Sequence, residues 1–372
     1  MKVAILQENL AKIVAAAARS VSSRPQLPVL ANILLKAEKG KLLAVGTDMM
    51  TSVGLWAGGK VEKEGAVTVP GRDVAALTAG LPAGTVELTA DGAVLTVVAG
   101  RTRAKLMGMA AEDFPEVDAK GKKAFEVDRE AWGEAMEKAL VCVSPDEGRP
   151  ILTGGKIEKE EGRRKKEEGG ILRLTATDGY RLGIVGVEAE KMELDEVVII
   201  PARTLGEAAR LAAGKVLTVE LTDDGGACFR FEDGWVKGKL LAGEFPAVDQ
   251  IIPQEFEAEM TVDRGELEKA VKLAAIFARE SANIVKWKIE EGVLRISANS
   301  PQIGENETGV EIIGKGNGEI AFNSRYLLDL LGSVSGAERL TFKMAGPVKP
   351  GMFGIEGDKN FKHVIMPVRV QK

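Results

Sequence analysis

The chain repeats one local pattern three times, and this repetition constrains the fold more than any other feature of the sequence. Residues 40–55, 169–185 and 291–310 each read as a strand, a short polar kink and a second strand. The kink residues Asp48 and Asp178 lie 130 residues apart, and the third kink follows after a further 121. A regular long spacing of this kind is typical of repeated structural units. The sequence therefore predicts three similar domains in tandem.

A second marker repeats in step with the first. After each copy comes a strand end, a helix-breaking residue and an arginine that opens a helix, at 67–77, 198–211 and 320–331. The breakers Pro70 and Pro201 lie 131 residues apart, close to the spacing of the kinks. Two independent markers that shift together indicate a true triplication and not a chance similarity.

Each unit is predicted to be α+β, with two helices packed on antiparallel sheets of about eight strands. An apolar stripe at helical spacing opens every unit, and short strand-like runs follow it. Polar segments with Pro or Gly separate the units, so we expect domains at 1–119, 120–252 and 253–372. In the third unit, Asp263 and Glu266 form a variant of the helix capping box. The stripes are Leu10, Ile13, Val14 and Ala17, then Trp132, Met136, Ala139 and Val143, and finally Leu267, Val271 and Ala274.

Composition and motifs exclude several classes of protein. With 372 residues, of which 45% are hydrophobic and 28% charged, the chain suits a globular protein with more than one core. It has no apolar run typical of a membrane helix or a signal peptide, so we expect a cytoplasmic location. Cys142 and Cys228 lack metal-ligand spacing, and the single histidine, His363, lies beside an apolar run that favours a structural role. We therefore expect neither catalysis nor a bound metal or cofactor.

The placement of charge points in a different direction from the net charge. A net charge of −5 and a pI of about 5.4 would by themselves disfavour nucleic-acid binding. Arg72, Arg203 and Arg325, however, each fall in the first turn of a predicted helix, where a cation is unfavourable because the helix N-terminus is already positive. The repetition of this unfavourable arginine in all three units indicates a surface that faces an anion such as a phosphate backbone.

Together these features resemble the bacterial DNA polymerase III β subunit family, the sliding clamps, over essentially the whole chain. The resemblance implies three tandem DNA-clamp domains per chain, with two chains assembled head to tail as a closed dimeric ring. It also implies a non-catalytic processivity factor that encircles double-stranded DNA without sequence preference. The implied partners are the replicative polymerase, the clamp loader and repair proteins, all bound through short linear motifs, with no membrane involved. The stretches that carry the resemblance are RPQLPVLANILL, GTDMM, TVPGR, GRTRAKL, DFPEVD, ATDGYRL, IIPAR, GEFPAVDQIIP, FNSRYLLDLL and VIMPVRV.

The same resemblance implies three groups of functional residues. The residues implied to face DNA are Arg24, Arg72, Arg149, Arg203, Asn323, Arg325 and Tyr326. The residues implied to form a peptide-binding pocket are Leu152, Thr177, Gly179, Tyr180, Arg181, Leu182, Pro246, Ile251, Val364, Met366, Pro367, Val368 and Arg369. The residues implied at the dimer interface are Ala104, Leu106, Ile276 and Phe277.

Further expectations concern the pocket. Its Leu, Ile, Val and Met side chains would form an adaptable apolar trough, while Arg and Thr at the edges would bond a peptide backbone. Tyr180, where many relatives carry His, and Arg181 should face this trough, whereas Leu172 and Leu174 should pack in the core. Because Pro367 cannot donate a hydrogen bond, we expect the end of the chain to leave a free sheet edge.

Some positions depart from the family pattern. Pro150-Ile151 follow Arg149 where relatives often carry aromatic residues, which weakens the expectation of a second DNA contact or a gate there. Ala104 is smaller than the residue that relatives often have. The charged stretch 156–170 is predicted to be a solvated hairpin loop. The alternative to a clamp is a triplicated, non-catalytic protein-binding scaffold that does not encircle DNA.

Overall fold

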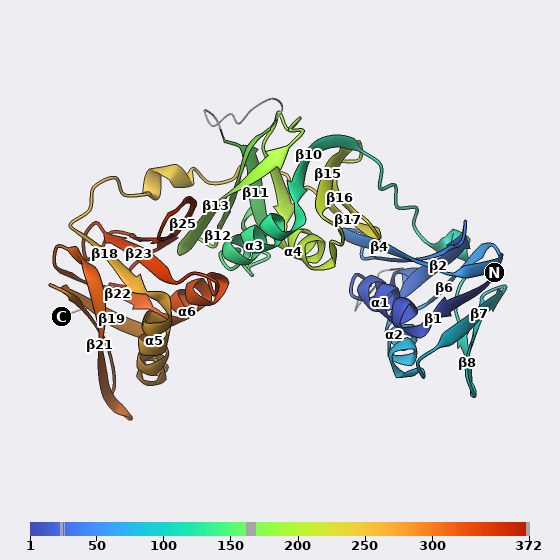
Figure 1. Cartoon of the computed structure of the whole chain (residues 1–372), viewed down its shortest axis with the longest axis horizontal. Coiled ribbons are helices and arrows are strands. Elements are labelled where there is room, and N and C mark those ends of the chain that lie inside the picture. The colour runs from blue at the N-terminus through green and yellow to red at the C-terminus, as the bar shows by residue number, and fades with distance from the viewer. Residues whose placement is uncertain (23–24, 26, 161–168, 370–372) are drawn as a thin grey trace. The chain divides into compact units, whose positions relative to one another are not determined.

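The computed structural model describes residues 1–22, 25, 27–160 and 169–369. Arg24 and the middle of the charged stretch 156–170 lie outside the described residues. Within the described residues, each repeat begins with a strand and a helix and places its second helix after several strands (Figure 1). This order matches the repeated pattern of the sequence.

Each repeat contains two described helices (Figure 1). The predicted apolar stripes are buried, except that Val143 follows the end of its helix and is only half-buried. The Asp263 side chain accepts a hydrogen bond from the Glu266 N–H (2.8 Å), which confirms the predicted cap. The helices are α1 (Gln7–Ala18), α2 (Gly71–Gly80), α3 (Arg129–Leu140), α4 (Ala202–Leu211), α5 (Arg264–Ala278) and α6 (Ser324–Ser333).

The described strands number nine in the first repeat and eight in each of the others. The first repeat has β1 (Lys2–Leu6), β2 (Asn32–Glu38), β3 (Lys41–Thr47), β4 (Thr51–Gly58), β5 (Lys60–Lys63), β6 (Gly65–Pro70), β7 (Thr85–Asp91), β8 (Val94–Ala99) and β9 (Thr102–Met107). The second has β10 (Lys122–Asp128), β11 (Gly154–Lys159), β12 (Gly170–Thr177), β13 (Arg181–Glu190), β14 (Val198–Pro201), β15 (Val216–Thr222), β16 (Gly226–Phe231) and β17 (Gly234–Lys239). The third has β18 (Ala258–Asp263), β19 (Ile284–Glu290), β20 (Val293–Ser300), β21 (Gly304–Lys315), β22 (Gly318–Asn323), β23 (Arg339–Met344), β24 (Gly351–Ile355) and β25 (Asp358–Ile365).

The chain forms two compact units, and the second repeat is divided between them. In one unit, β17 of the second repeat pairs with β4 of the first. In the other, β13 of the second repeat pairs with β25 of the third. The first unit comprises Met1–Glu130, Glu190–Glu193 and Arg203–Leu240, and the second unit comprises Ala131–Ala189, Leu194–Ala202 and Leu241–Lys372.

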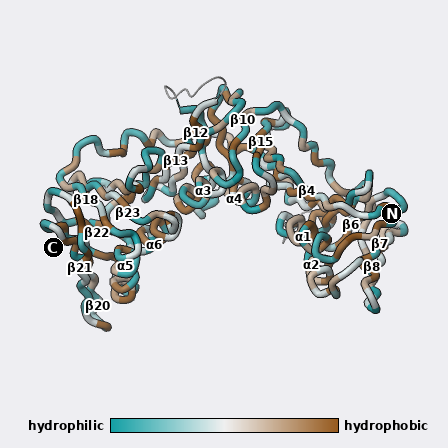
Figure 2. Tube along the Cα trace, viewed as in Figure 1, coloured by the Kyte–Doolittle hydropathy of each residue, from teal (hydrophilic) through white to brown (hydrophobic). Residues whose placement is uncertain are grey.

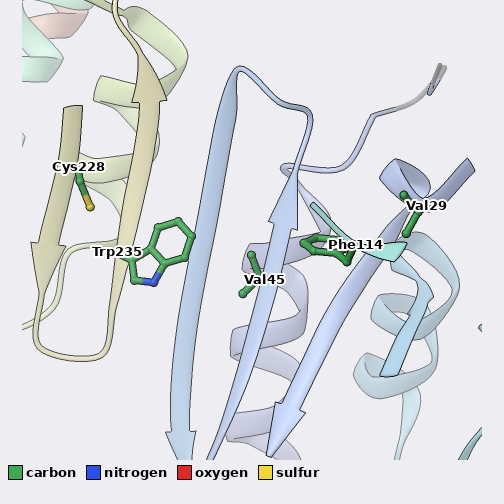
Figure 3. Packing of buried hydrophobic residues seen from close by; sticks show 5 residues of the cluster. All are labelled: Val29, Val45, Phe114, Cys228 and Trp235. Carbon is green, nitrogen blue, oxygen red and sulfur yellow. The ribbon is translucent and has the colours of Figure 1, made fainter. Parts of the chain in front are cut away.

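The first unit contains two antiparallel sheets. One has the order β5-β1-β7-β8-β9, and the other follows the pairings β6-β2-β3-β4-β17-β16-β15-β10. Trp235 on β17 lies opposite Gly54 on β4, where an added Cβ would lie 2.4 Å from the indole ring. Glycine at this position therefore lets the two repeats share one sheet. Figure 3 shows Trp235 and Cys228 on strands of the second repeat and Val29, Val45 and Phe114 in the first, all members of one buried cluster.

The second unit is also built on antiparallel strands. Its pairings run β14-β11-β12-β13-β25-β24-β23-β18, and β18 also pairs with β21 of a sheet ordered β22-β19-β20-β21. Trp287, Phe322 and Phe342 meet edge to face in its core, with ring centroids 5.3–5.9 Å apart. Leu172 and Leu174 on β12 are buried, as the sequence predicts.

Apolar and polar residues alternate along many strands, which Figure 2 shows as changes between brown and teal. In β8, for example, buried and half-buried positions alternate from Val94 to Ala99. Such a period of two gives each strand one inward face. The sheets therefore enclose the cores, while kinks and linkers at the strand ends remain available to form surface sites.

Candidate functional site

A hydrogen-bonded kink joins β12 to β13 in the second unit. One carboxylate oxygen of Asp178 accepts hydrogen bonds from the N–H groups of Tyr180 (2.8 Å) and Arg181 (2.9 Å). The Thr177 hydroxyl accepts from the Gly179 N–H (3.1 Å) and donates to the Arg181 carbonyl (2.7 Å). Gly179 has a φ of +91°, in the left-handed region that favours glycine. The kink is thus fixed by its own side chains, and it leaves Tyr180 59% exposed.

A pocket of about 140 Å³ lies beside this kink and is called here the second-unit pocket. Leu182 on β13 pairs in register with Val364 on β25, and both side chains are buried. The wall opposite the kink comes from the linker that precedes the third repeat and from the short helices η3 (Pro150–Thr153) and η4 (Val248–Ile251). Ten of the thirteen predicted pocket residues line it. The lining residues are Leu152, Thr177, Gly179, Tyr180, Arg181, Leu182, Pro246, Ala247, Val248, Ile251, Val364 and Met366.

The last described residues, 367–369, are not among the lining residues. The Met366 N–H donates to the Tyr180 carbonyl (2.8 Å), which extends the contact between β25 and the kink by one residue. The Val368 N–H then donates to the Ala321 carbonyl on β22 (2.8 Å). The expectation of a free sheet edge is therefore correct only in part, because β25 ends at Ile365 but the chain beyond it is still hydrogen-bonded.

Two lining residues, Ala247 and Val248, are absent from the sequence-based set. Val248 is buried and packs with Leu182, Ile184 and Val364 in one apolar cluster. A signal for it exists in the sequence, because the FPAVD of the linker repeats the FPEVD at the end of the first repeat. A segment repeated at two linkers indicates a common packing role that the family resemblance alone did not reveal.

Arg181 is bonded within the chain, which differs from the expectation that it is available to a peptide. Its guanidinium donates to Asp178 (3.0 Å) and to Asp329 on α6 (2.6 Å), and its carbon lies 4.6 Å from the centre of the Tyr326 ring. The side chain is only 11% exposed. Arg181 therefore ties the kink to α6, and the Thr177 hydroxyl is likewise occupied by the kink itself.

Tyr326 and Asn323, both predicted to face DNA, have partners inside the second unit. The Tyr326 ring stacks on Tyr180, with centroids 6.4 Å apart and planes inclined by 22°. Burial raises the pKa of the Tyr326 hydroxyl. The Asn323 side chain accepts a hydrogen bond from the Arg325 N–H (3.0 Å) and so caps α6. Tyr326 thus lies next to the kink, a position that the sequence did not indicate.

Two of the predicted DNA-facing arginines are exposed without a partner. Arg72 and Arg325 lie in the first turns of α2 and α6, as predicted. In the part of the chain that the structure describes, neither guanidinium makes a hydrogen bond or an ion pair. Each is therefore a cation that an external anion can reach.

The other two described arginines of this set are already paired. Arg203 on α4 bonds the Asp48 carboxylate and donates to the Arg19 carbonyl (2.8 Å). Arg149 pairs with Asp146 (3.0 Å). Both side chains remain about half exposed, so these ion pairs compete with any phosphate only weakly.

The predicted interface residues lie on an edge strand and on a helix. Ala104 and Leu106 are half-buried on β9, which is the edge strand of its sheet. Ile276 on α5 is 45% exposed, and its neighbour Phe277 is half-buried. Both positions therefore leave apolar surface in contact with solvent in the single chain.

The single histidine is buried in the second unit beside a cysteine. The Cys142 sulfur lies 3.6 Å from Nδ1 of His363, and neither residue is exposed. Burial lowers the pKa of His363 to about 3 and raises the pKa of the Cys142 thiol. Both groups are therefore neutral at ordinary pH, which agrees with the structural role expected of His363.

None of the described helices is long and apolar enough to cross a membrane.

Comparisons with known proteins agree along the whole chain. Residues 1–118, 126–247 and 249–369 match the N-terminal, central and C-terminal domains of the DNA polymerase III beta subunit. The beta sliding clamp of Streptomyces coelicolor is 31% identical over 100% of both chains, and that of Synechocystis is 29% identical over 100% of both. A sliding clamp from Pseudomonas aeruginosa, solved bound to griselimycin, superposes with a TM-score of 0.90 at 28% identity, covering 100% of each chain. The chain therefore belongs to the DNA polymerase III β subunit family, whose members are sliding clamps and not enzymes.

Proposed function

We propose that two copies of this sliding clamp close head to tail around duplex DNA and hold a replicative polymerase through a peptide in the second-unit pocket. The observation that carries the proposal is the apolar pocket itself, which gathers residues from four separate segments of the chain. Leu182, Val364 and Met366 offer it apolar surface without a filling aromatic ring. The clamp loader and repair proteins are proposed to use the same pocket in turn.

Two free strand edges support the proposed ring. β9 is the edge strand of its sheet, and before Ile312 the described pairing of β21 is with β20 alone. The exposed side chains of β9 include Arg103 and Lys105, whereas those of β21 include Glu305 and Glu307. Pairing these edges between two chains would satisfy unpaired backbone groups and bring opposite charges together. Contacts of this head-to-tail kind must close or polymerise, and a ring of two chains closes them.

Charge reversal tests the ring. We expect the intact chain to elute near twice 39.6 kDa and the variant Arg103→Glu with Lys105→Glu to elute as a monomer. Adding Glu305→Lys with Glu307→Lys to that variant should restore the dimer, because the attraction is rebuilt with the signs exchanged. A dimer that is indifferent to both pairs of charge changes, or to Ile276→Ala with Phe277→Ala, would place the joint elsewhere.

The exposed arginines Arg72 and Arg325, together with Arg203, are proposed to contact the phosphate backbone. Because a protein of net charge −5 would make only a few such contacts, direct affinity should be weak and should fall only gently with salt. Retention should come from encirclement, so the clamp should remain on circular DNA and leave linear DNA. Reversing these three charges should impair loading and sliding while the fold persists. Equal retention on linear and circular DNA would favour the scaffold alternative.

A truncation tests the pocket. A glutamine-led peptide with two spaced Leu or Phe side chains is expected to bind weakly and to exchange readily, since burying two such residues contributes only roughly 3–6 kcal/mol before ordering costs. Ending the chain after Ile365 removes Met366 from the lining and should abolish this binding, while the dimer still forms. Unchanged peptide affinity in the truncated chain would show that the pocket is elsewhere.

The domain bounds at 1–119, 120–252 and 253–372 are also proposed to hold as units of repeat. The regular spacing of the repeated markers supports these bounds, because the second helix of each repeat begins directly after Pro70, Pro201 or Asn323. Limited proteolysis should cut first near 119 and 252, and prior cleavage inside β4 or β13 would speak against these bounds.

A further inference from the structure

The first unit carries a second kink with the same hydrogen bonds as the pocket kink. One carboxylate oxygen of Asp48 accepts from the N–H groups of Met50 (3.0 Å) and Thr51 (2.7 Å). The Thr47 hydroxyl accepts from the Met49 N–H (3.0 Å), as Thr177 does in the second unit. The two kinks thus share one hydrogen-bonding pattern, which indicates that the kink is a common element of these repeats.

A smaller cavity lies beside this kink, where the repeat predicts one. The Lys239 N–H donates to the Met50 carbonyl (3.0 Å), just as the Met366 N–H donates to the Tyr180 carbonyl (2.8 Å). The cavity measures about 80 Å³ and is lined by the kink, the linker at 115–117 and the end of β17. We call it the first-unit hollow.

The rim of the first-unit hollow exposes two methionines. Met49 is 48% exposed and Met50 is 50% exposed. Met49 has a φ of +74°, whereas its counterpart in the second unit is Gly179. A side chain in the left-handed region strains the backbone, and such strain concentrates where a surface has a function. Methionine is also the side chain that adapts best to varied apolar partners.

The two lysines at the first-unit hollow differ in whether their charge is paired. Lys237 is buried, and its ammonium donates to Asp224 (2.7 Å) and to the Asp118 carbonyl, so it is already neutralised. Lys239 is exposed and, among the described residues, has no carboxylate within 4.0 Å. Glu116 is exposed on the linker that lines the hollow. An acidic group of a ligand is therefore favoured next to Lys239 at the end of β17. It is disfavoured next to the linker, where Glu116 would repel it.

We infer that the first-unit hollow is a second docking site, and that its occupant is an extended peptide in which one apolar residue precedes an acidic residue. The apolar side chain lies against Met49 and Met50, and the carboxylate pairs with Lys239. The extended form of the occupant rests on the proposed function, since it is taken from the matching second-unit pocket. The small volume of the hollow, and the one cation that is unpaired among its described lining residues, distinguish this occupant from the glutamine-led peptide with two apolar anchors.

Methyl resonances of the methionines provide the test on the full-length dimer. Met49 and Met50 are assigned by their loss in Met49→Ile and Met50→Ile, and the probe is the capped peptide Gly-Ser-Leu-Asp-Gly. We expect saturable shifts of these two resonances at about millimolar peptide, as befits one buried side chain. Replacing Leu by Ser in the probe should remove the shifts. Lys239→Glu should weaken binding about fivefold or more, and Lys239→Arg should preserve it.

Several results would overturn the inference. They are the absence of shifts at Met49 and Met50, equal shifts with the serine peptide, and shifts confined to Met352 and Met366 near the other pocket. The glutamine-led peptide is titrated into the same sample and read at Met366. If that titration fails while Met49 and Met50 still respond to the probe, the proposed function fails and the docking site stands.

Discussion

The two kinks share the same backbone hydrogen bonds, but the cavities beside them differ in polarity. In each, an aspartate holds two N–H groups and the following strand end donates to the kink carbonyl. In the second unit the strands next to the kink supply Leu182 and Val364, whereas the matching positions in the first unit are Ser52 and Lys237. One cavity is therefore mainly apolar, whereas the other combines the apolar Met49 and Met50 with polar and charged side chains. The two repeats therefore share the backbone of the kink, while the side chains at these two positions account for much of the difference between the cavities.

The contact from each kink to its neighbouring helix also differs. In the second unit Arg181 lies over the Tyr326 ring and bonds Asp329. At the matching positions of the first unit, the Thr51 and Thr204 hydroxyls share a short hydrogen bond (3.0 Å). The larger pair in the second unit leaves Tyr180 stacked at the pocket edge. The connection between kink and helix is thus made by a charged, aromatic contact in one unit, and by a compact polar pair together with the Arg203–Asp48 ion pair in the other.

The largest expected effect concerns the strand pairs behind the kinks. Trp235 lies opposite Gly54 in the first unit and is buried, while Lys362 lies opposite Ile184 in the second and is exposed. Trp235→Ala should lower the free energy of unfolding by about 3–5 kcal/mol, because it leaves a large cavity. Lys362→Ala should change it by less than about 0.5 kcal/mol. Denaturant titration measures both, and similar effects in the two variants would contradict the comparison.

The next effect concerns the kink that Arg181 ties to α6. Arg181→Gln removes the bonds to Asp178 and Asp329, so the kink should lose its fixed position beside the pocket. We expect the affinity for the glutamine-led peptide to fall about tenfold, a change of roughly 1.4 kcal/mol. Thr51→Ala, the matching change in the first unit, should leave that affinity unchanged. Fluorescence anisotropy measures both, and an unchanged affinity in Arg181→Gln would mean that the kink holds without α6.

A third prediction concerns the buried cation of the first-unit hollow. The hydrogen bond from Lys237 lowers the pKa of Asp224 below its ordinary value of 3.8. The stability from this pair is therefore fully present above pH 3.8 and is lost as the pH falls through the lower folded pKa. Lys237→Val, which copies Val364, should change stability at neutral pH by less than about 1 kcal/mol, because the Asp224 side chain is 56% exposed and water can solvate it once Lys237 is removed.

The acid response then distinguishes the variant from the native chain. Below pH 3.8 Lys237→Val should lose less stability than the native chain, because it removes the largest of the interactions that lower the pKa of Asp224 in the folded state, leaving the Thr222 hydroxyl. Lys239→Val, which removes an unpaired exposed cation, serves as the control and should follow the native profile. Thermal unfolding across this pH range measures the difference, and identical profiles for all three proteins would contradict the role given to the pair.

The smallest expected effect concerns the exposed side chains on the two rims. Tyr180→Ala removes the stack on Tyr326 and should weaken the glutamine-led peptide about two- to threefold, with no change in stability beyond about 0.5 kcal/mol. Met50→Ala on the other rim should not affect this peptide. Isothermal titration of both variants gives the comparison, and a tenfold loss in Tyr180→Ala would make the tyrosine a principal anchor of the peptide.

Local patterns predicted the repeated parts of this protein well. The residues of the stripe from Leu10 to Ala17 share one face of α1 because a helical period repeats within a few residues and needs no distant partner. The kinks at Asp48 and Asp178 form because their side chains bond backbone groups two and three residues away. The spacing of such local signals was sufficient to identify three repeats, and the motifs between them were sufficient to identify the family.

Only the tertiary structure determined how side chains distant in the sequence are used. Arg181 is bonded to Asp329, 148 residues away, so it is not free at the pocket edge. Lys237 is buried because β17 pairs with β4 of another repeat. Register between strands so far apart depends on the packing of both whole repeats, and no local period encodes it. The sequence therefore determined the repeated backbone and the family, while long-range pairing decided which charges are neutralised and which cavity is apolar.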